Sequence, residues 1–324
     1  MIKKNPIKLW FVGFWRPSTE EYIRKNNLYR LLSKYWDITL SPQNPDFLLY
    51  SCKGYDHLKY DCLRIFYTGE NIRPNFKHCD YAFSFDYPVT ERNYRLPLYR
   101  LYDEYSDLFQ SRDPEKIISE RRKFCCFLSS NPNAHERNTF FESLNIYKKV
   151  DSGGKVLNNI GYQIGSQNEK ISWLKGYKFS IAFENSQYPG YTTEKILHAL
   201  VTNTIPIYWG NPAVANDFNP KAFINCHDYK SFDDVIEIVK EIDQHDVLYR
   251  EYLNQPYFPG GTENDFCREE NIIAKFNHIF TEGTEFIPRH IKAAQKITFL
   301  TLRTRYMFKK SIKKILRIDQ GAGL

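Results

Sequence analysis

The chain has 324 residues, 42% of them hydrophobic and 26% charged, so we expect a folded protein of one large domain or two average ones. No run of about 18 or more apolar residues occurs, and a transmembrane helix is therefore not expected. The net charge of +7 comes from the end of the chain, because residues 289–317 hold ten Lys or Arg and no Asp or Glu. The remainder is mildly acidic, which argues against a nucleic-acid-binding face on the main body.

The amino-terminal residues and the cysteines bear on the compartment of the protein. MIKKNPIKLWFVGFW begins charged and becomes apolar without a small-residue cleavage site, so we interpret it as a first β-strand and not as a signal peptide. The seven cysteines include no C-x-x-C pair, which is typical of reduced thiols in a cytoplasmic protein. Because no ligand-pair spacing is present, a cysteine-bound metal is not expected either.

The first third of the chain alternates between strand and helix patterns. Strands are predicted at IKLWFVGF, DITL, PDFLLYS, LRIFYTGEN and YAFSFDY, and residues 21–36 have the apolar spacing of a helix. Such alternation predicts a parallel sheet with crossover connections. Residues 96–122 lose the rhythm, so we expect an interdomain connection there or, as the alternative, an ordinary surface helix.

A second alternation follows this connection. KFCCFLSS, the end of KISWLKGYKFSIAFEN, TIPIYWG and AFINCHD are predicted strands, and KVDSGGKV is a predicted turn. Helices are predicted within residues 131–147, 192–203 and 232–243, with a short one from residue 170. Two α/β units of similar size predict two Rossmann-like domains that face each other across a cleft.

The segment FENSQYPGYTTEKI, from residue 183, combines a strand end, a turn and a helix start, which is where α/β proteins bind ligands. Thr192 or Thr193 can cap the helix. Lys195 lies in the first helical turn, where the helix dipole disfavours a cation, and a bound phosphate would remove that conflict. Glu194 is explained equally well by capping and by hydrogen bonds to sugar hydroxyls.

Two further strand ends carry candidate side chains. Arg137 follows the strand FCCFLSS and is either a solvated residue paired with Glu136 or Glu142, or a guanidinium placed on a diphosphate. Glu70 follows LRIFYTG and is either an acid that faces the cleft or a turn carboxylate in water.

The motifs that are missing exclude some chemistries. The paired glycines of DSGGKVLNNIG form neither a G-x-G-x-x-G fingerprint nor a Walker P-loop, so nicotinamide binding and Walker-type phosphoryl transfer are not expected. No D-x-D occurs. We therefore expect cationic side chains and a helix start, and no metal ion, to stabilise a leaving phosphate.

These motifs resemble those of the α-1,3-fucosyltransferases, glycosyltransferase family 10. FENSQYPGYTTEKI with NTIPIYWGNP is similar to the family signature, and FYTGEN with CDYAFSFD is similar to its first-domain motif. SNPNAHERNTFFESLN, SGGKVLNNIG and FNPKAFINCHDYKSFDDVIE match in the same order, with SGG where relatives often have TGG. The match covers residues 60–245 well. Because no membrane anchor is expected, the chain resembles the bacterial members of the family.

The resemblance implies a GT-B fold and an inverting transfer of L-fucose from GDP-fucose, without a further cofactor. The acceptor would be O3 of N-acetylglucosamine in an N-acetyllactosamine-type glycan, giving a Lewis-x-like product of a surface polysaccharide or lipopolysaccharide. Glu70 would be the general base.

The resemblance also implies the donor-binding residues. Arg137 and Lys195 would contact the diphosphate of GDP-fucose. Tyr191 and Glu194 would contact the ribose or the fucose, and Asn185 lies in the same donor loop. No metal ligand is implied.

The expected organisation is an acceptor-binding domain at 1–118, a GDP-fucose-binding domain at 119–285 and a basic amphipathic tail at 286–324. In RYMFKKSIKKILRI the apolar residues share one helical face and the cations take the rest, as in helices that lie on anionic membranes. We therefore expect a cytoplasmic protein, peripheral on the inner face of the cytoplasmic membrane. The alternatives are a helix packed on the body and a disordered tail.

Three alternatives for function stay open. The protein could be a GT-B enzyme with another linkage, such as O4, or another sugar nucleotide. It could be a catalytically idle carbohydrate-binding protein that keeps the scaffold. The third alternative, a nucleic-acid-binding protein that uses the basic tail, is not favoured, and no nucleic-acid partner is expected.

Overall fold

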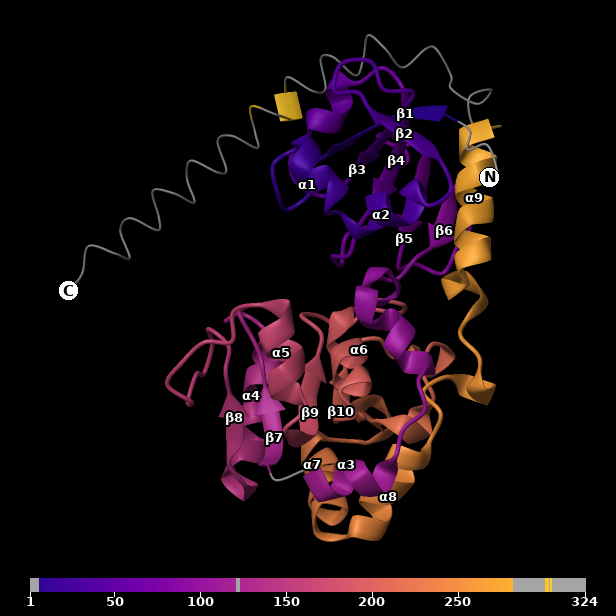
Figure 1. Ribbon diagram of the computed structural model, residues 1–324. Coiled ribbons are helices and arrows are strands. Elements are labelled where there is room, and N and C mark those ends of the chain that lie inside the picture. The colour runs from indigo at the N-terminus through magenta and orange to yellow at the C-terminus, as the bar shows by residue number, and fades with distance from the viewer. Residues whose placement is uncertain (1–5, 121–122, 282–300, 303, 305–324) are drawn as a thin grey trace, which may run out of the picture. The chain divides into compact units, whose positions relative to one another are not determined.

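The structure is a computed structural model that describes residues 6–120, 123–281, 301, 302 and 304. The chain divides into two compact units (Figure 1). The first unit contains the chain up to Ser84, Pro88–Arg95 and the residues from Glu269 onward, and the second contains Phe85–Tyr87 and Leu96–Arg268.

The first unit is built on a six-stranded parallel sheet of order β2-β1-β3-β4-β5-β6. Its strands are β1 (Pro6–Val12), β2 (Asp37–Leu40), β3 (Phe47–Tyr50), β4 (Leu63–Tyr67), β5 (Tyr81–Ser84) and β6 (Asn93–Arg95). Every residue of β3, β4 and β5 is buried, as expected for central strands covered on both faces. A short 3-10 helix, η1 (Asp56–Lys59), precedes β4.

The single helix predicted over residues 21–36 is two helices, α1 (Glu20–Arg24) and α2 (Asn27–Ser33). The break lies at Asn26, whose side chain accepts a hydrogen bond from the backbone N–H of Leu28. Asn26 therefore caps α2, because a side-chain oxygen satisfies an N–H that the helix itself leaves without a partner.

The helix α9 (Glu269–Thr281) belongs to the first unit although it comes late in the chain. Phe276 stacks on Phe83 with ring centroids 4.0 Å apart, and Phe280 lies 4.6 Å from Phe47. Figure 1 shows this orange helix beside the indigo and purple elements of the first unit. The expected second domain of 119–285 therefore needs correction, because apolar rings from α9 complete the core of the first sheet.

The second unit is built on a five-stranded parallel sheet of order β11-β10-β9-β7-β8. Its strands are β7 (Lys123–Phe127), β8 (Val150–Ser152), β9 (Tyr177–Phe183), β10 (Ile205–Trp209) and β11 (Ile224–Asn225). Its longer helices are α4 (His135–Tyr147), α5 (Gln167–Leu174), α6 (Glu194–Val201), α7 (Phe232–Gln244) and α8 (Asp246–Asn254). Short 3-10 helices are η4 (Val214–Asn216), η5 (Pro220–Ala222), η6 (Cys226–Asp228), η7 (Pro259–Gly261) and η8 (Asp265–Cys267). One of these strands, β8, occupies part of the predicted turn KVDSGGKV.

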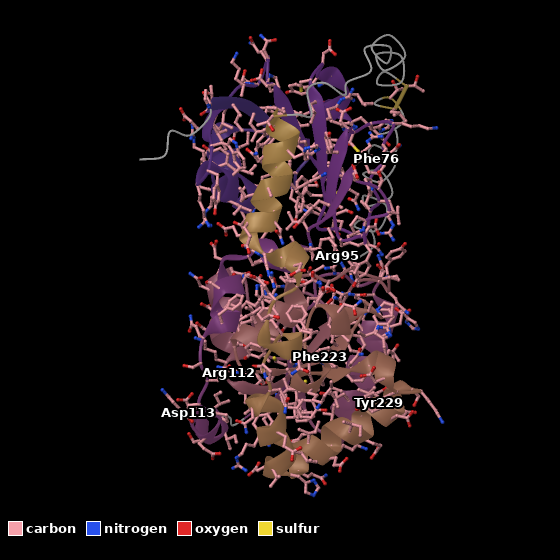
Figure 2. The ribbon with its side chains drawn as sticks, turned by 90° about the vertical axis from the view of Figure 1, so that its right-hand side faces the viewer. Phe76, Arg95, Arg112, Asp113, Phe223 and Tyr229 are labelled. Atoms are coloured by element: carbon pink, nitrogen blue, oxygen red, sulfur yellow. The ribbon has the colours of Figure 1, made fainter. Side chains whose placement is uncertain are left out.

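The segment after Arg95 belongs to the second unit and forms η2 (Leu98–Leu101), η3 (Asp103–Phe109) and α3 (Pro114–Glu120). Tyr99, Tyr105 and Leu108 share a buried cluster with apolar residues of α6. Figure 2 labels Arg112 near Asp113, and the Arg112 guanidinium lies 3.9 Å from the ring centroid of Tyr257. The expected boundary at 118 is therefore wrong: this connection packs onto the second sheet's helices, and the chain leaves the first unit after Arg95.

Two expectations concern the whole chain. All seven cysteines are free. Among the residues that the structure describes, no helix has the length and apolar character needed to cross a membrane. The tail at 286–324 lies outside the described residues, apart from residues 301, 302 and 304.

Candidate functional site

A buried carboxylate organises the junction between β9 and α6. Glu184 directly follows β9, and its side chain has no exposed surface. Its Oε1 accepts a hydrogen bond of 2.7 Å from the backbone N–H of Thr193, and its Oε2 accepts one of 2.7 Å from Thr193 Oγ1. Thr193 is the residue before α6, as predicted, but its own side chain caps no helical N–H. The carboxylate of Glu184 therefore holds the start of the helix.

Lys195 is bound to the same carboxylate. Its Nζ lies 3.0 Å from Glu184 Oε2 and 3.6 Å from Glu194 Oε1, and its side chain is 19% exposed. Although burial opposes it, the two carboxylates hold the pKa of Lys195 above its ordinary value. The two carboxylates thus offset the unfavourable position of this cation at the start of the helix. The position of Lys195 alone therefore does not require a bound phosphate.

The neighbouring acid Glu194 keeps its charge. Burial alone would raise the pKa of Glu194, but Lys195 and Lys170 hold it well below its ordinary value. Burial raises the pKa of Glu184, against the influence of Lys195. Lys170 comes from α5, and its ammonium interacts electrostatically with Glu194 and Lys195. Glu194 therefore remains an anion at neutral pH, with a side chain 21% exposed.

Arg137, in the first turn of α4, is buried and reaches the same region. It is 3% exposed, and its guanidinium donates hydrogen bonds to the carbonyls of Phe183 at 3.3 Å and Asn131 at 3.4 Å. Its Nε is buried without a hydrogen-bond acceptor among the described residues. An unpaired buried donor costs about 1–3 kcal/mol, which a bound oxygen acceptor would recover. The alternative of a solvated Arg137 is therefore wrong.

Three cations and two anions thus meet at the starts of α4 and α6. The electrostatic influence of Glu184 and Glu194 reaches Arg137, and that of Arg137 reaches Lys195. Lys170 is the third cation, so the group carries an excess of one positive charge. We call these residues the charged cluster: Arg137, Lys170, Glu184, Glu194 and Lys195. An excess of positive charge beside two helix N-termini favours an anionic ligand.

The loop that follows β10 shapes the cluster. Gly210 has φ +149°, and a Cβ there would lie 2.5 Å from Glu184 Cγ, so a side chain would displace the carboxylate. Asn211 is fully buried, and its Oδ1 accepts hydrogen bonds from the backbone N–H groups of Gly190 and Ala213. Its Nδ2 donates to Thr192 Oγ1 at 3.0 Å. These two residues, in the motif WGNP, fix the loop before α6.

The remaining predicted donor residues lie on that loop. Asn185 is exposed directly after Glu184. Tyr191 is 2% exposed, and its ring packs edge-on against Phe85 with centroids 5.1 Å apart. The structure therefore brings Arg137, Glu194 and Lys195 into one cluster and uses Tyr191 for packing beside it.

Sequence reasoning missed the structural roles of Glu184, Lys170 and Asn211. The only signal for Glu184 was its place directly after a strand, among several polar neighbours. Lys170 carried no signal at all, because it lies in the helix before β9, distant in sequence from the helix it faces.

Glu70 lies in the first unit, three residues after β4. Its backbone N–H donates to Thr68 Oγ1 at 2.9 Å, and its backbone carbonyl accepts from Ile72, so the turn is well defined. The residue is half-buried. In the part of the chain that the structure describes, no group of three or more His, Cys, Asp or Glu is placed to hold a metal ion. The role of Glu70 and the expectation that the reaction needs no metal ion stay predictions.

Comparisons with known proteins agree with this architecture. Residues 9–102 match the family described as the alpha-(1,3)-fucosyltransferase FucT N-terminal domain, and residues 118–257 match glycosyltransferase family 10 (fucosyltransferase) C-term. A crystal structure of an alpha1,3-fucosyltransferase with GDP-fucose superposes with a TM-score of 0.74 at 33% identity, over 88% of this chain and 93% of that chain. One with GDP gives a TM-score of 0.75 at 33% identity, over 87% and 92% of the two chains.

Two relatives illustrate the range of similarity. An alpha-(1,3)-fucosyltransferase, FucT, of Helicobacter pylori is 37% identical over 294 residues, which cover 77% of this chain and 61% of that protein. The human 4-galactosyl-N-acetylglucosaminide 3-alpha-L-fucosyltransferase 9 is 28% identical over 141 residues, covering 42% and 38%. The chain therefore spans less than two thirds of the length of these relatives.

The two parallel α/β units and these superpositions confirm the GT-B fold of a glycosyltransferase. The chain belongs to the fucosyltransferases of glycosyltransferase family 10.

Proposed function

We propose that this protein is an inverting α-1,3-fucosyltransferase that moves L-fucose from GDP-fucose to O3 of N-acetylglucosamine. The observation that carries the proposal is the charged cluster, in which the buried Arg137 has an Nε without an acceptor and the cations outnumber the carboxylates. The phosphate oxygens of a nucleoside diphosphate supply both a hydrogen-bond acceptor for Arg137 Nε and the negative charge that balances the cations. Solved members of the family carry GDP-fucose or GDP, which is consistent with this ligand.

The proposed reaction breaks the bond between the anomeric carbon of fucose and the β-phosphate of GDP. Negative charge develops on the departing phosphate oxygen, where Arg137, Lys195 and the start of α6 stabilise it. Positive charge develops on the sugar ring, and the ionised Glu194 offsets it. Lys195 is held by Glu184, so its ammonium is oriented before the ligand arrives.

Glu70 is the proposed general base. It takes the proton from the acceptor hydroxyl as that oxygen attacks the anomeric carbon, an effect typically of about 10²–10⁴-fold. A single displacement on the face opposite to the leaving GDP inverts the anomeric configuration. The step balances: the proton of the acceptor hydroxyl moves to the carboxylate of Glu70, and the electron pair of the broken bond leaves with the phosphate of GDP.

The proposed acceptor is an N-acetyllactosamine-type glycan, and the product is Lewis-x-like. The printed name of the human relative describes a 4-galactosyl-N-acetylglucosaminide acceptor, which supports this class. A role in surface polysaccharide or lipopolysaccharide, and a cytoplasmic position on the membrane through the basic tail, are further parts of the proposal. The polysaccharide role rests on the resemblance to the family, and the membrane position rests on the sequence of residues 289–317.

The test is a transfer assay with GDP-fucose and N-acetyllactosamine, with linkage and anomeric configuration determined by NMR. We expect fucose on O3 of N-acetylglucosamine, and parallel reactions with UDP-galactose and GDP-mannose should give no product. Fucose on O4, or faster transfer from another sugar nucleotide, would contradict the proposal. Glycan binding without any turnover would favour a catalytically idle carbohydrate-binding protein.

The role of Glu70 is tested by Glu70→Gln, which keeps the shape but removes the base. Transfer should fall by about 10²–10⁴-fold while the affinity for GDP, measured by calorimetry, is unchanged. Glu91→Gln is the matched control in the same unit, since Glu91 is exposed and its carboxylate acts on Lys275 and not on Glu70 in the described interactions. Turnover of Glu70→Gln close to that of the control would remove Glu70 from the mechanism.

A further inference from the structure

An aromatic groove lies in the first unit, and none of its lining residues belongs to the charged cluster. It has a volume of about 380 Å³ and follows the carboxyl end of β1. Phe11, Phe14, Trp15 and Tyr22 line it together with the polar residues Arg16 and Asn26. Volumes of roughly 300–1,000 Å³ lined by aromatic side chains with a few polar groups are typical of small-molecule sites. No step of the proposed reaction uses these residues.

The floor of the groove is held in place by the backbone. Gly13 has φ +72°, and a Cβ there would lie 2.9 Å from the carbonyl oxygens of Ser51 and Lys53. The backbone N–H of Lys53 donates to the carbonyl of Gly13 at 2.8 Å. The loops that follow β1 and β3 are therefore tied together, and the next residues, Phe14 and Trp15, are presented from a fixed turn.

Trp15 presents a large apolar surface to solvent. It is 66% exposed, and the Lys53 ammonium lies 3.5 Å from its ring centroid. Because the cation covers one face of the indole, the exposed area lies on the other face and the edges. Tyr22, 38% exposed, adds a second ring to the groove, and Phe14 packs 5.5 Å from the buried Phe11. Exposed aromatic clusters of this kind mark binding surfaces.

The chemistry of the groove fits a pyranose ring. One face of galactose presents only C–H groups, because its axial O4 points to the other face, and such a face stacks on an indole. The hydroxyls at the ring edge need donors. Arg16 makes no ion pair among the described residues, and its guanidinium lies 6.0 Å from the ring centroid of Tyr22, at the rim. A lipid chain would use the apolar floor but not this rim.

The position of the groove relates it to Glu70. β1, β3 and β4 are neighbours in one parallel sheet, so their carboxyl ends share an edge. Trp15 and Glu70 each follow their strand by three residues. Two strand spacings separate β1 from β4, about 10 Å in all, which is close to the length of a disaccharide.

We propose that Trp15 and Tyr22 bind the galactose of the acceptor, while the neighbouring N-acetylglucosamine lies at Glu70. The inference rests on the proposed function and deepens it, because it names the subsite that distinguishes a disaccharide acceptor from a monosaccharide. Trp15 is then a specificity-determining residue that contacts the acceptor, and it contributes nothing to donor binding.

The test compares Trp15→Ala with wild type on two acceptors. For N-acetyllactosamine we expect KM to rise about tenfold, as expected for the loss of one aromatic contact. Kinetic constants with N-acetylglucosamine alone, and the affinity for GDP, should be unchanged. Trp15→Phe keeps an aromatic ring and should therefore raise KM for N-acetyllactosamine by less than Trp15→Ala does. Phe109→Ala, which removes an aromatic side chain 57% exposed in the second unit, is the matched control and should change none of these values.

A binding experiment separates failure of this inference from failure of the proposed function. In saturation-transfer NMR with N-acetyllactosamine, the galactose protons should receive the strongest saturation from wild type, and the effect should disappear in Trp15→Ala. This readout needs no turnover. Equal KM increases for both acceptors, no increase for either, or saturation confined to N-acetylglucosamine in wild type would overturn the galactose subsite. Absence of fucose transfer with galactose saturation intact would overturn only the proposed function.

Discussion

Glu184 shows how much one buried side chain decides at this site. Its two oxygens bind the N–H and hydroxyl of Thr193 and the ammonium of Lys195, and the approach is open only because Gly210 has no Cβ. Removing one partner of such a pair leaves an uncompensated buried charge, at about 3–5 kcal/mol, somewhat less here because Lys195 is partly exposed. Lys195 therefore has two roles that must be separated, as the counter-ion of Glu184 and as the proposed contact to the diphosphate.

We expect Lys195→Met to lower both the stability of the protein and its affinity for GDP, the latter by about tenfold or more, because a charge-assisted contact to phosphate is lost. The double variant Lys195→Met with Glu184→Gln should regain stability in thermal unfolding, since no buried charge is left unpaired, but it should not regain GDP affinity in calorimetry. Lys175→Ala, which removes an exposed lysine after α5, is the control. Full recovery of GDP binding in the double variant would mean that Lys195 only neutralises Glu184.

At the scale of elements, α6 links the charged cluster to the core of the second unit. Ile196, Leu197 and Leu200 pack on its apolar side with residues of η2 and η3. His198 is fully buried, its Nε2 lies 2.7 Å from Gln167 Nε2, and its ring meets that of Tyr102 edge-on. Burial, helped by Lys170, lowers the pKa of His198 to about 3, although Glu194 opposes the shift. The helix therefore carries an uncharged histidine about one turn after Lys195.

This histidine predicts a pH dependence of stability. Below its ordinary pKa of 6.5, the unfolded chain binds a proton at His198 that the folded chain accepts only near pH 3. The free energy of unfolding should therefore fall as the pH is lowered through this window, by at most about 1.4 kcal/mol per pH unit for each such group. His57 in the first unit, with a pKa lowered to about 3 mainly by burial, acts in the same direction.

We expect His198→Gln to flatten the dependence of Tm on pH between 4 and 6.5 relative to wild type, because the variant has no proton to gain there on unfolding. The control His135→Gln removes an exposed histidine at the start of α4 and should follow the wild-type curve. Parallel curves for wild type and His198→Gln would show that His198 takes up its proton at the same pH in the folded and the unfolded protein, which contradicts the lowered pKa. A second variant, His57→Gln, should flatten the curve by a similar amount through the first unit.

At the scale of the whole molecule, the order of elements along the chain differs from their grouping in space. The chain leaves the first unit after Arg95, builds the second unit and returns with α9 to complete the first (Figure 1). Phe276 has no exposed surface and stacks on Phe83, while Phe280 meets Trp36 with centroids 5.1 Å apart. The first unit therefore depends on residues that lie after the second unit in the sequence.

We expect Phe276→Ala to destabilise the protein by about 3–5 kcal/mol, because the substitution leaves a cavity against the first sheet. The neighbouring exposed residue gives the control, since Asn277→Ala removes a side chain from the solvent face of the same helix. Urea unfolding followed by the fluorescence of the tryptophans measures both. A loss below about 1 kcal/mol for Phe276→Ala would mean that α9 is dispensable for the core of the first unit.

The sequence predicted most of the local structure and the kind of site, because both depend on short-range patterns. DITL is a strand over the predicted residues, β9 and α6 lie within the segments predicted for them, and the motifs around residues 183–212 identified the family. The split of the helix at Asn26 and the strand β8 were missed. The split depends on the cap formed by Asn26, and β8 depends on its pairing with β7; apolar periodicity registers neither.

By itself, the sequence determined that the chain forms parallel α/β units, that it is a family 10 fucosyltransferase, and that Arg137, Glu194 and Lys195 were candidates for one site. Apolar spacing and contiguous motifs are enough for these conclusions. Only the tertiary structure decided that α9 joins the first unit, that residues 96–120 join the second, and that Glu184 holds Lys195. The first two bring together surfaces far apart in the chain, and the third depends on how the loop between β9 and α6 folds back on itself. Which partners meet is set by packing, which apolar spacing does not encode.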